Sequence, residues 1–381
     1  MTELNHIHYI GYYTSRGNPN DYIVFPSCNG KMDYIVRCLT ESGYPLSILS
    51  LGESTTMWSL PKRETVDGLF ITYVGTIPRA FNGIGRILAR LFLILQFVTY
   101  LLTKPKKADK VIVYHSTAIV KAIRMVKRIR PSLDIIYEIE EIYAAAYGHD
   151  DSHIRSELMT TLFTTRYIVV NDILAGKINC LAPEAIVVPC YGNFSCNAPL
   201  TPLEKTKKDA LVIVYAGIIG LDDSDVYLAI DAMRYLPDTY QLKIVGYGSE
   251  FAVNQLRRRI EGVSNVRYDG MLQGKEYSDY LMSCDVGISP RRLPDELSDY
   301  TFPSKVLVYF SHGLVTVCSR INCVENSKLG PYITFINDLT PEGVSRAIIE
   351  ASEKHSDPSL NIRVVSELDH IFKDSLADLL K

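Results

Sequence analysis

Short apolar segments alternate with amphipathic helical segments along almost the whole chain, and this alternation limits the possible folds more than any other feature. In the helical segments, apolar residues recur at the three- and four-residue spacing of one helix face. Buried strands that alternate with helices form parallel sheets covered by helices on both faces. We therefore predict an α/β protein. The predicted strands are 6–13, 45–51, 68–74, 110–115, 134–140, 166–171 and 185–190, followed by 210–217, 240–248, 266–270, 285–290, 314–319 and 332–336.

The length of 381 residues predicts two domains, because a single core stops growing at about 250–300 residues. We expect two Rossmann-like, doubly wound domains over 1–195 and 210–355, facing a central cleft at the carboxyl ends of their strands. Residues 196–209 have the proline-rich, charged composition of a linker. A helix over 356–381 is expected to pack back on the first domain. The other predicted helices are 31–42, 86–102, 118–130, 156–163, 225–235, 250–261, 275–283, 304–311 and 341–353.

The composition excludes a general attraction to nucleic acid, because the formal net charge is only −3. Any binding of anions must come from local groups. The eight cysteines lack metal-ligand spacing, which predicts reduced thiols in a cytoplasmic protein without a bound metal.

Residues 86–107 combine an apolar helix with basic residues. The apolar part, 87–102, has 16 residues, whereas a membrane span needs about 20. One interpretation is a buried helix that packs on a sheet. The other is a helix whose basic end rests on anionic lipid headgroups at the inner face of the cytoplasmic membrane. Both can hold for one helix.

The segment 299–314, DYTFPSKVLVYFSHGL, places a proline, a hydroxyl and a cation directly before an apolar helix. The free N–H groups of a first helical turn and the helix dipole favour phosphate. Pro303, Ser304 and Lys305 therefore form a candidate anion site. The alternative is an ordinary helix start.

The second half resembles the carboxyl domain of GT-B glycosyltransferases of family 4. The resemblance depends on ordered landmarks over about 130 residues, none of which is specific alone. In the first half, 29–35 resembles the glycine-bearing turn that faces the acceptor, and 187–193 resembles the turn before the linker. The closest similarity is to bacterial enzymes that build capsule or O-antigen polysaccharide. The landmarks are Tyr215-Ala216-Gly217, KIVGYGSE (243–250), VRYDGM (266–271), 280–290 and FPSKVLVYFSHGL (302–314).

This resemblance implies a metal-independent, retaining transfer of a sugar from a nucleotide sugar, most simply a UDP-sugar, to a glycan or a polyprenyl- or other lipid-linked acceptor. Without a metal, helix N-termini and cations must stabilise the leaving diphosphate. No cofactor is expected. The resemblance assigns acceptor binding to Asn29, Gly30 and Lys31, and nucleotide-sugar binding to Gly217, Gly246, Gly248, Phe302, Pro303, Ser304 and Lys305.

The chain departs from the family pattern at several positions. Tyr300 and Val308 stand where the family has two glutamates, one of which binds the ribose. The loop 218–223 carries Asp222 and Asp223 instead of basic residues. Arg291 and Arg292, after a predicted strand, are proposed to supply the missing cations; the alternative is a solvated basic loop.

Three acids cluster where the strand 134–140 ends. Glu138 and Glu140 share one side of that strand and Glu141 lies on the other. Since unpaired buried carboxylates are costly, they either form ion pairs or serve the reaction. As catalytic candidates we take Glu140 and Glu141, which could bind sugar hydroxyls or act as a base. His115, at the end of another strand, is a further candidate.

Two other functions are compatible with parts of the sequence. A catalytically degenerate GT-B protein, acting as a scaffold or partner of another glycosyltransferase, would explain the substituted positions. A nicotinamide enzyme is disfavoured, because 15–22, after the first strand, lacks the G-x-G-x-x-G spacing.

Overall fold

The computed structural model describes residues 4–15, 21–55, 58–77, 83–196, 210–221, 225–292, 295–354 and 357–381. The chain forms two compact units. Unit 1 comprises Met1–Asn193 with Phe372–Lys381, and unit 2 comprises Phe194–Ile371. The predicted linker at 196–209 lies outside the described residues except for Cys196.

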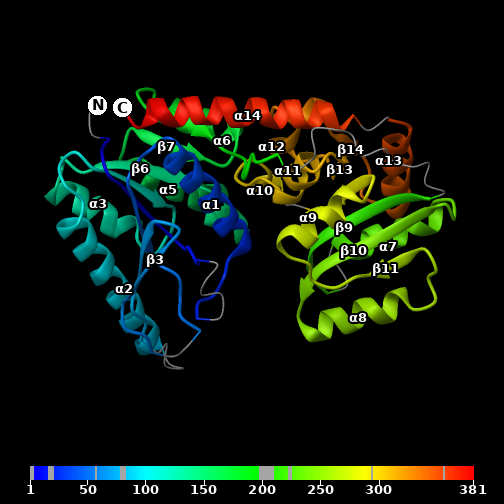
Figure 1. Cartoon of the computed structure of the whole chain (residues 1–381), viewed down its shortest axis with the longest axis horizontal. Coiled ribbons are helices and arrows are strands. Elements are labelled where there is room, and N and C mark those ends of the chain that lie inside the picture. Colours follow the sequence, from blue (N-terminus) through cyan, green and yellow to red (C-terminus); the bar gives the residue numbers. More distant parts are fainter. Residues whose placement is uncertain are drawn as a thin grey trace. The chain divides into compact units, whose positions relative to one another are not determined.

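Unit 1 is built on an eight-stranded sheet of order β3-β4-β2-β1-β5-β6-β7-β8 (Figure 1). Neighbouring strands are parallel, except that β3 and β4 pair antiparallel. The central strands β1 and β5 are buried along their whole length, as expected for a sheet covered on both faces. The strands are β1 (Ile7–Gly11), β2 (Leu46–Ser50), β3 (Lys62–Val66), β4 (Leu69–Tyr73), β5 (Lys110–Tyr114), β6 (Asp134–Ile139), β7 (Arg166–Val169) and β8 (Ile186–Pro189).

The helices of unit 1 begin at local capping signals. The side chains of Asp150 and Asn171 accept the free N–H groups of His153 and Leu174, which starts α5 and α6. A proline in the first turn starts α1. The helices are α1 (Pro26–Glu41), α2 (Gly83–Thr103), α3 (Val120–Ile129), α4 (Tyr143–Ala146), α5 (Asp151–Thr161) and α6 (Asp172–Leu181).

Unit 2 contains a six-stranded parallel sheet of order β11-β10-β9-β12-β13-β14. The strands are β9 (Leu211–Ile219), β10 (Tyr240–Gly248), β11 (Val266–Tyr268), β12 (Val286–Ser289), β13 (Val315–Ser319) and β14 (Thr334–Ile336). The helices are α7 (Asp225–Ala232), α8 (Glu250–Ile260), α9 (Gly274–Met282), α10 (Asp295–Ser298), α11 (Ser304–Ser311), α12 (Asn322–Glu325), α13 (Pro341–Glu353) and α14 (Pro358–Leu379), with 3-10 turns at Met233–Tyr235 and Gly330–Tyr332.

Strand β9 supplies both faces of the unit 2 core. Ile213 and Tyr215 belong to one buried cluster, with residues of α7, α8 and α13. Val212 and Val214 belong to a second cluster, with residues of α9 and α11. This alternation follows from the two-residue period of a strand and produces a sheet with helices on both faces.

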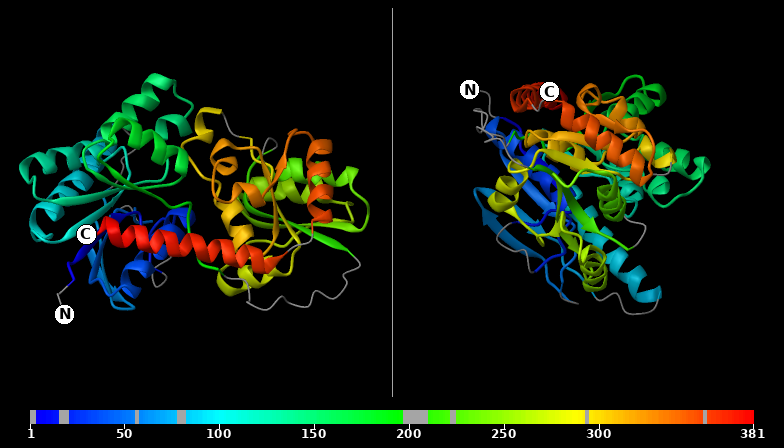
Figure 2. Two further views of the ribbon diagram at one scale, coloured as in Figure 1. Left: turned by 90° about the horizontal axis from the view of Figure 1, so that it is seen from above. Right: turned by 90° about the vertical axis from the view of Figure 1, so that its right-hand side faces the viewer.

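The last helix, α14, contributes to both units (Figure 2). In unit 2, the Asn361 side chain donates hydrogen bonds to the carbonyls of Phe310 and Leu314, at 3.1 Å each. In unit 1, the Phe372 ring lies 5.4 Å from the Tyr34 ring. The sequence predicted packing on the first domain; Phe372–Lys381 belongs to unit 1, and α14 as far as Ile371 belongs to unit 2.

Every predicted strand is present, with ends that shift by a few residues. Strand β3 was not predicted, because its residues are polar and largely exposed, and neither were the helix α6 and the short helices α4, α10 and α12. Helix α2 is longer than predicted and is the one described helix whose length and apolar composition would allow it to cross a membrane.

Candidate functional site

The candidate anion site in unit 2 lies at the carboxyl end of β9, where Lys305 of α11 crosses Gly217. A Cβ atom on Gly217 would lie 2.3 Å from Lys305 Cε, so glycine lets the lysine chain lie directly against the strand and a larger residue would displace it. The Tyr309 hydroxyl, also on α11, accepts a 2.8 Å hydrogen bond from the Ala216 N–H and fixes the helix against the strand. The structure thus brings together two residues that the sequence predicted for the same ligand.

The ammonium of Lys305 has weak partners. It donates a 2.8 Å hydrogen bond to the Tyr215 hydroxyl and lies 3.9 Å from the centre of that ring. Its distance to the Asp225 carboxylate is 3.7 Å, longer than a good ionic hydrogen bond. Burial lowers the pKa of Lys305 to about 8; Asp225 opposes this shift and Arg291 adds to it. The site therefore holds a desolvated cation with capacity for another anion.

The N-terminus of α11 adds backbone donors next to this lysine. Pro303 precedes the helix in an extended conformation and, as the N-cap residue, offers no side-chain hydrogen bond to the first turn. Phe302 and Pro303 are buried, whereas Ser304 is exposed. An uncapped first turn with an adjacent cation is suited to phosphate.

The other residues predicted for the nucleotide sugar have structural explanations in the described part of unit 2. Gly246 pairs with Gly217 across β9 and β10, and a Cβ there would lie 1.8 Å from the Gly217 carbonyl oxygen. A Cβ on Gly248 would lie 2.3 Å from the Ile219 carbonyl oxygen. The exposed Arg292 donates to the Leu339 carbonyl at 3.3 Å. Their roles in binding stay predictions.

The acid beside Lys305 was missed by the sequence analysis. Asp225 begins α7 and lies close to the lysine, although the two are far apart in the chain. The nearest sequence signal was the acidic loop 218–223, of which Asp222 and Asp223 lie outside the described residues.

In unit 1, a predicted acceptor residue meets a predicted catalytic residue. Lys31 of α1, 3% exposed, forms an ion pair with Glu140 directly after β6 and donates to the Cys190 carbonyl at 2.6 Å. Burial would lower the pKa of Lys31, but the Glu140 carboxylate outweighs burial and the pKa lies above its ordinary value. The ammonium is already neutralised by a protein partner.

Glu138 extends this cluster into the interior. It is fully buried and accepts a 2.6 Å hydrogen bond from the Tyr9 hydroxyl. Burial raises the pKa of Glu138, and the nearby Glu140 raises it further. We infer that Glu138 holds a proton, so that one lysine balances one carboxylate.

The remaining residues predicted for the acceptor lie on α1. The Asn29 side chain accepts from the Thr14 N–H at 2.7 Å and donates to the Thr14 carbonyl at 2.9 Å, which ties α1 to the segment after β1. No atom lies within 4 Å of a Cβ built on Gly30, beyond its own neighbourhood. Glu141 is half-buried after β6.

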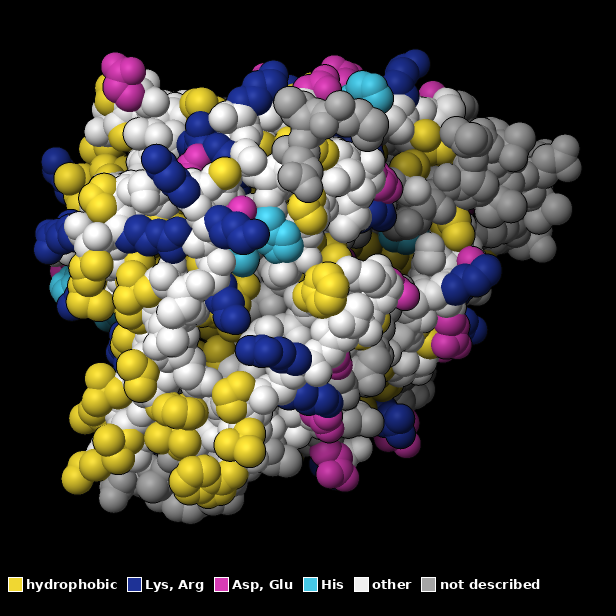
Figure 3. All heavy atoms as spheres, turned by 60° about the vertical axis from the view of Figure 1, so that its left-hand side comes forward, with side chains coloured by type: hydrophobic (Ala, Val, Ile, Leu, Met, Phe, Trp, Pro, Cys, Tyr) yellow, Lys and Arg dark blue, Asp and Glu magenta, His cyan; other side chains and the backbone are white. Residues whose placement is uncertain are grey.

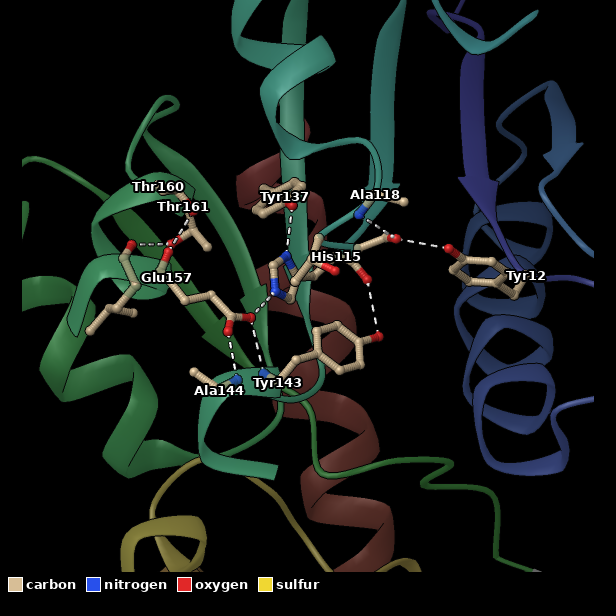
Figure 4. A network of polar contacts seen from close by, with 12 residues as sticks. Tyr12, His115, Ala118, Tyr137, Tyr143, Ala144, Glu157, Thr160 and Thr161 are labelled. Atoms are coloured by element: carbon tan, nitrogen blue, oxygen red, sulfur yellow. Dashed lines mark hydrogen bonds and ion pairs between the residues drawn. The ribbon is translucent and has the colours of Figure 1, made fainter. Parts of the chain in front are cut away.

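His115 lies in a buried polar network, shown in Figure 4. Its Nδ1 is 2.7 Å from the Tyr137 hydroxyl, and its Nε2 is 2.8 Å from Glu157 Oε1. Glu157, which the sequence analysis missed, also accepts from the N–H groups of Tyr143 and Ala144 at the start of α4. Both ring nitrogens are thus engaged: Nδ1 joins the end of β5 to β6, and Nε2 joins it to α5 and, through Glu157, to α4. That arrangement explains His115 structurally, and its catalytic role stays a prediction.

Within the described residues, no group of three or more His, Cys, Asp and Glu side chains could hold a metal ion. In the described part of unit 2, Lys305, Arg291 and the first turn of α11 are groups that could bind an anion.

No protein-family model matches the chain, and no curated protein matches its sequence. Solved structures match nearly all of it. An α,α-trehalose-phosphate synthase (UDP-forming) from Burkholderia xenovorans, in complex with glucose-6-phosphate, aligns with a TM-score of 0.69 at 10% identity, over 99% of this chain and 100% of that one. The fold is GT-B.

Two further structures agree. The catalytic domain of starch synthase IV from Arabidopsis thaliana, bound to ADP and acarbose, aligns with a TM-score of 0.67 at 9% identity, over 99% of each chain. An E. coli structure described as trehalose-6-phosphate bound with UDP-2-fluoro glucose aligns at 0.67 and 13% identity, over 98% of this chain and 99% of that one. The predicted GT-B architecture is confirmed. The resemblance to family 4 and to capsule or O-antigen enzymes stays a prediction.

Proposed function

We propose that the protein is a retaining glycosyltransferase that moves a sugar from a UDP-sugar to an acceptor hydroxyl. The observation that carries the proposal is Lys305, a half-buried cation that lies over Gly217 beside the first turn of α11. Two similar structures support the ligand class, since one is bound with UDP-2-fluoro glucose and another with ADP.

In this proposal, the bond between the sugar and the diphosphate breaks while a bond to the acceptor oxygen forms. Lys305 and the N–H groups of α11 stabilise the charge that develops on the leaving diphosphate, without a metal ion. Arg291 lies near enough to Lys305 to lower its pKa and adds a second cation. Glu140 and Glu141 are the proposed groups for sugar or acceptor hydroxyls.

We further propose that the acceptor is a glycan or a lipid-linked saccharide of cell-surface polysaccharide assembly, and that the protein works in the cytoplasm. The sequence resemblance supports this assignment. The complex of the Burkholderia xenovorans structure with glucose-6-phosphate supports a saccharide acceptor in general terms.

The test is calorimetric titration and thermal denaturation of the full chain with UDP and a panel of UDP-sugars. Lys305→Ala should weaken UDP binding by about 10- to 100-fold, because a hydrogen bond to a charged group is worth about 1.5–3 kcal/mol. Lys275→Ala, which removes an exposed lysine of α9 in the same unit, is the matched control and should bind UDP normally. Failure of the unaltered protein to bind any nucleotide or nucleotide sugar would contradict the proposal.

A catalytically degenerate partner protein is the second candidate, and the family's two missing glutamates favour it. Tyr300 and Val308, which replace them, carry no carboxylate. The two candidates differ in turnover. Release of UDP from a donor in the presence of an acceptor supports the enzyme, whereas UDP binding without turnover, together with binding to another glycosyltransferase, supports the partner.

A further inference from the structure

Helix α2 presents an apolar face to solvent. Its exposed leucines and isoleucines recur at spacings of three, four or seven residues, which places them on one side of the helix. Among its residues only Gly85, Phe97 and Leu101 are buried. A surface helix of a soluble domain normally turns a polar face outward, so this apolar stripe indicates a surface that binds another partner. The stripe consists of Ile84 (68% exposed), Ile87, Leu88, Leu91 (55%), Leu95 (62%) and Leu102.

The opposite side of α2 is hydrogen-bonded to the rest of unit 1. The Gln96 side chain accepts from the Gly75 N–H at 2.8 Å and donates to the Gly75 carbonyl at 3.0 Å. The Tyr100 hydroxyl lies 2.9 Å from His8 Nδ1. These polar contacts hold the helix along the protein, so α2 lies on a surface and does not span a bilayer, although its length and composition would allow a span.

The residues around the stripe are strongly basic. Between residues 83 and 133 the sequence has eleven lysines and arginines and one acid, Asp109, which is buried and paired with His8. Helix α3 packs beside α2 and adds exposed apolar residues, Met125 and Ile129. The exposed basic residues of α2, α3 and the segment after α2 include Arg86, Lys104, Lys106, Lys107, Lys121 and Arg128.

Figure 3 brings the side of α2 and α3 forward. Hydrophobic side chains crowd the lower left of this face, and Lys and Arg side chains gather next to them, with few Asp or Glu side chains among them. The apolar stripe and the basic residues thus belong to one surface.

We propose that this α2–α3 surface docks on an anionic lipid bilayer. The apolar side chains enter the boundary between headgroups and acyl chains, and the lysines and arginines bind lipid phosphates. A second copy of the chain is a poorer occupant, because a two-fold contact through this surface would bring the same basic residues against each other. The proposal does not depend on sugar transfer, so the two can fail separately.

The experiment is sedimentation of the full chain with sucrose-loaded vesicles of phosphatidylcholine alone or mixed with phosphatidylglycerol. The partition coefficient should be about tenfold or more higher on the anionic vesicles, since each basic residue near the surface adds about a fivefold factor. Binding should weaken as salt rises from about 0.05 to about 0.5 M, because the screening length shortens.

Two sets of variants test the surface. Leu91→Glu with Leu95→Glu, and separately Arg86→Glu with Lys121→Glu and Arg128→Glu, should each lower partitioning on anionic vesicles by about tenfold or more. Leu181→Glu on α6 and Arg155→Glu on α5 are exposed residues of the same unit and serve as matched controls. All variants change exposed side chains, so melting temperatures should stay close to that of the unaltered protein.

Loss of vesicle binding in both sets, with normal binding of the controls, supports the proposal. Absence of binding to anionic vesicles overturns it, as does equal loss in the controls. A concentration-dependent dimer that Leu91→Glu with Leu95→Glu dissociates, in a protein that does not sediment with vesicles, would assign the surface to a second copy and also overturn the proposal.

Discussion

Each unit holds a lysine close to the carboxyl end of a strand, buried in unit 1 and half-buried in unit 2, and the two lysines have different partners. Lys31 in unit 1 forms an ion pair with Glu140, and its pKa lies above the ordinary value. Lys305 in unit 2 donates a 2.8 Å hydrogen bond to the Tyr215 hydroxyl and lies 3.7 Å from the Asp225 carboxylate. Burial lowers its pKa to about 8. The Lys31 ammonium is already neutralised by a carboxylate of the protein, whereas the Lys305 ammonium would be stabilised by an added anion. The strength of the ion pair therefore distinguishes Lys31, a structural lysine, from Lys305, a candidate ligand-binding lysine.

The largest expected difference between Lys31 and Lys305 is in their contributions to the free energy of unfolding. Lys31→Met leaves Glu140 without its partner and should lower the free energy of unfolding by about 3–5 kcal/mol. Lys305→Met breaks a long ion pair with Asp225 and a hydrogen bond to the Tyr215 hydroxyl, at a side chain that is 22% exposed, and should cost only about 1 kcal/mol. Urea denaturation of both variants measures the difference. The double variant Lys31→Met with Glu140→Gln should recover part of the lost stability. Equal losses of stability in Lys31→Met and Lys305→Met would contradict the assignment of a structural role to Lys31 alone.

An intermediate effect should follow from moving Lys305 without removing it. In Gly217→Ala the new Cβ would lie 2.3 Å from Lys305 Cε, so the flexible lysine must shift. We expect about tenfold weaker UDP binding in calorimetry, with little loss of stability. Gly176→Ala on α6, where no atom lies within 4 Å of the added Cβ, is the control and should leave UDP affinity unchanged. Unaltered UDP affinity in Gly217→Ala would remove Lys305 from the site.

The smallest effect concerns pH. The lowered pKa means that the folded protein binds fewer protons than the unfolded chain between pH of about 8 and 10.5, so the Lys305 contribution to stability rises with pH over that window. UDP affinity should change in the opposite direction and fall by at most about tenfold per pH unit above pH 8, because the diphosphate needs the ammonium.

Titration calorimetry from pH 7 to pH 9 measures this dependence. Lys305→Arg keeps its charge throughout that range and should flatten the curve. A slope above pH 8 that persists in Lys305→Arg would assign the titration to another group.

Much of the fold could be predicted from the sequence, because the buried strands of parallel sheets are almost continuously apolar. Strand β3 could not, since Lys62–Val66 is polar and pairs antiparallel at the sheet edge. The outward face of α2 could not be predicted either. Periodicity shows that a helix has an apolar side but does not show whether protein or solvent faces it.

Individual residues of the candidate sites could be predicted from the sequence, but most of the contacts between them could not. Gly217 and Lys305 were expected to share a ligand, and they lie against each other. Lys31 and Glu140 were given separate roles, because 109 positions separate them and nothing local marks the pair. Asp225 was missed for the same reason: its partner is brought to it only by the folded sheet.

The contribution of α14 to both units has a consequence for biosynthesis. Its Asn361 binds the carbonyls of Phe310 and Leu314 at the end of α11, and its Phe372 fills part of the interior around Tyr34. Both sets of contacts come from residues that are translated after every strand of the two sheets. Neither unit can therefore reach its final packing before α14 has been synthesised, and a nascent chain that stalls near residue 357 would expose apolar surface on both.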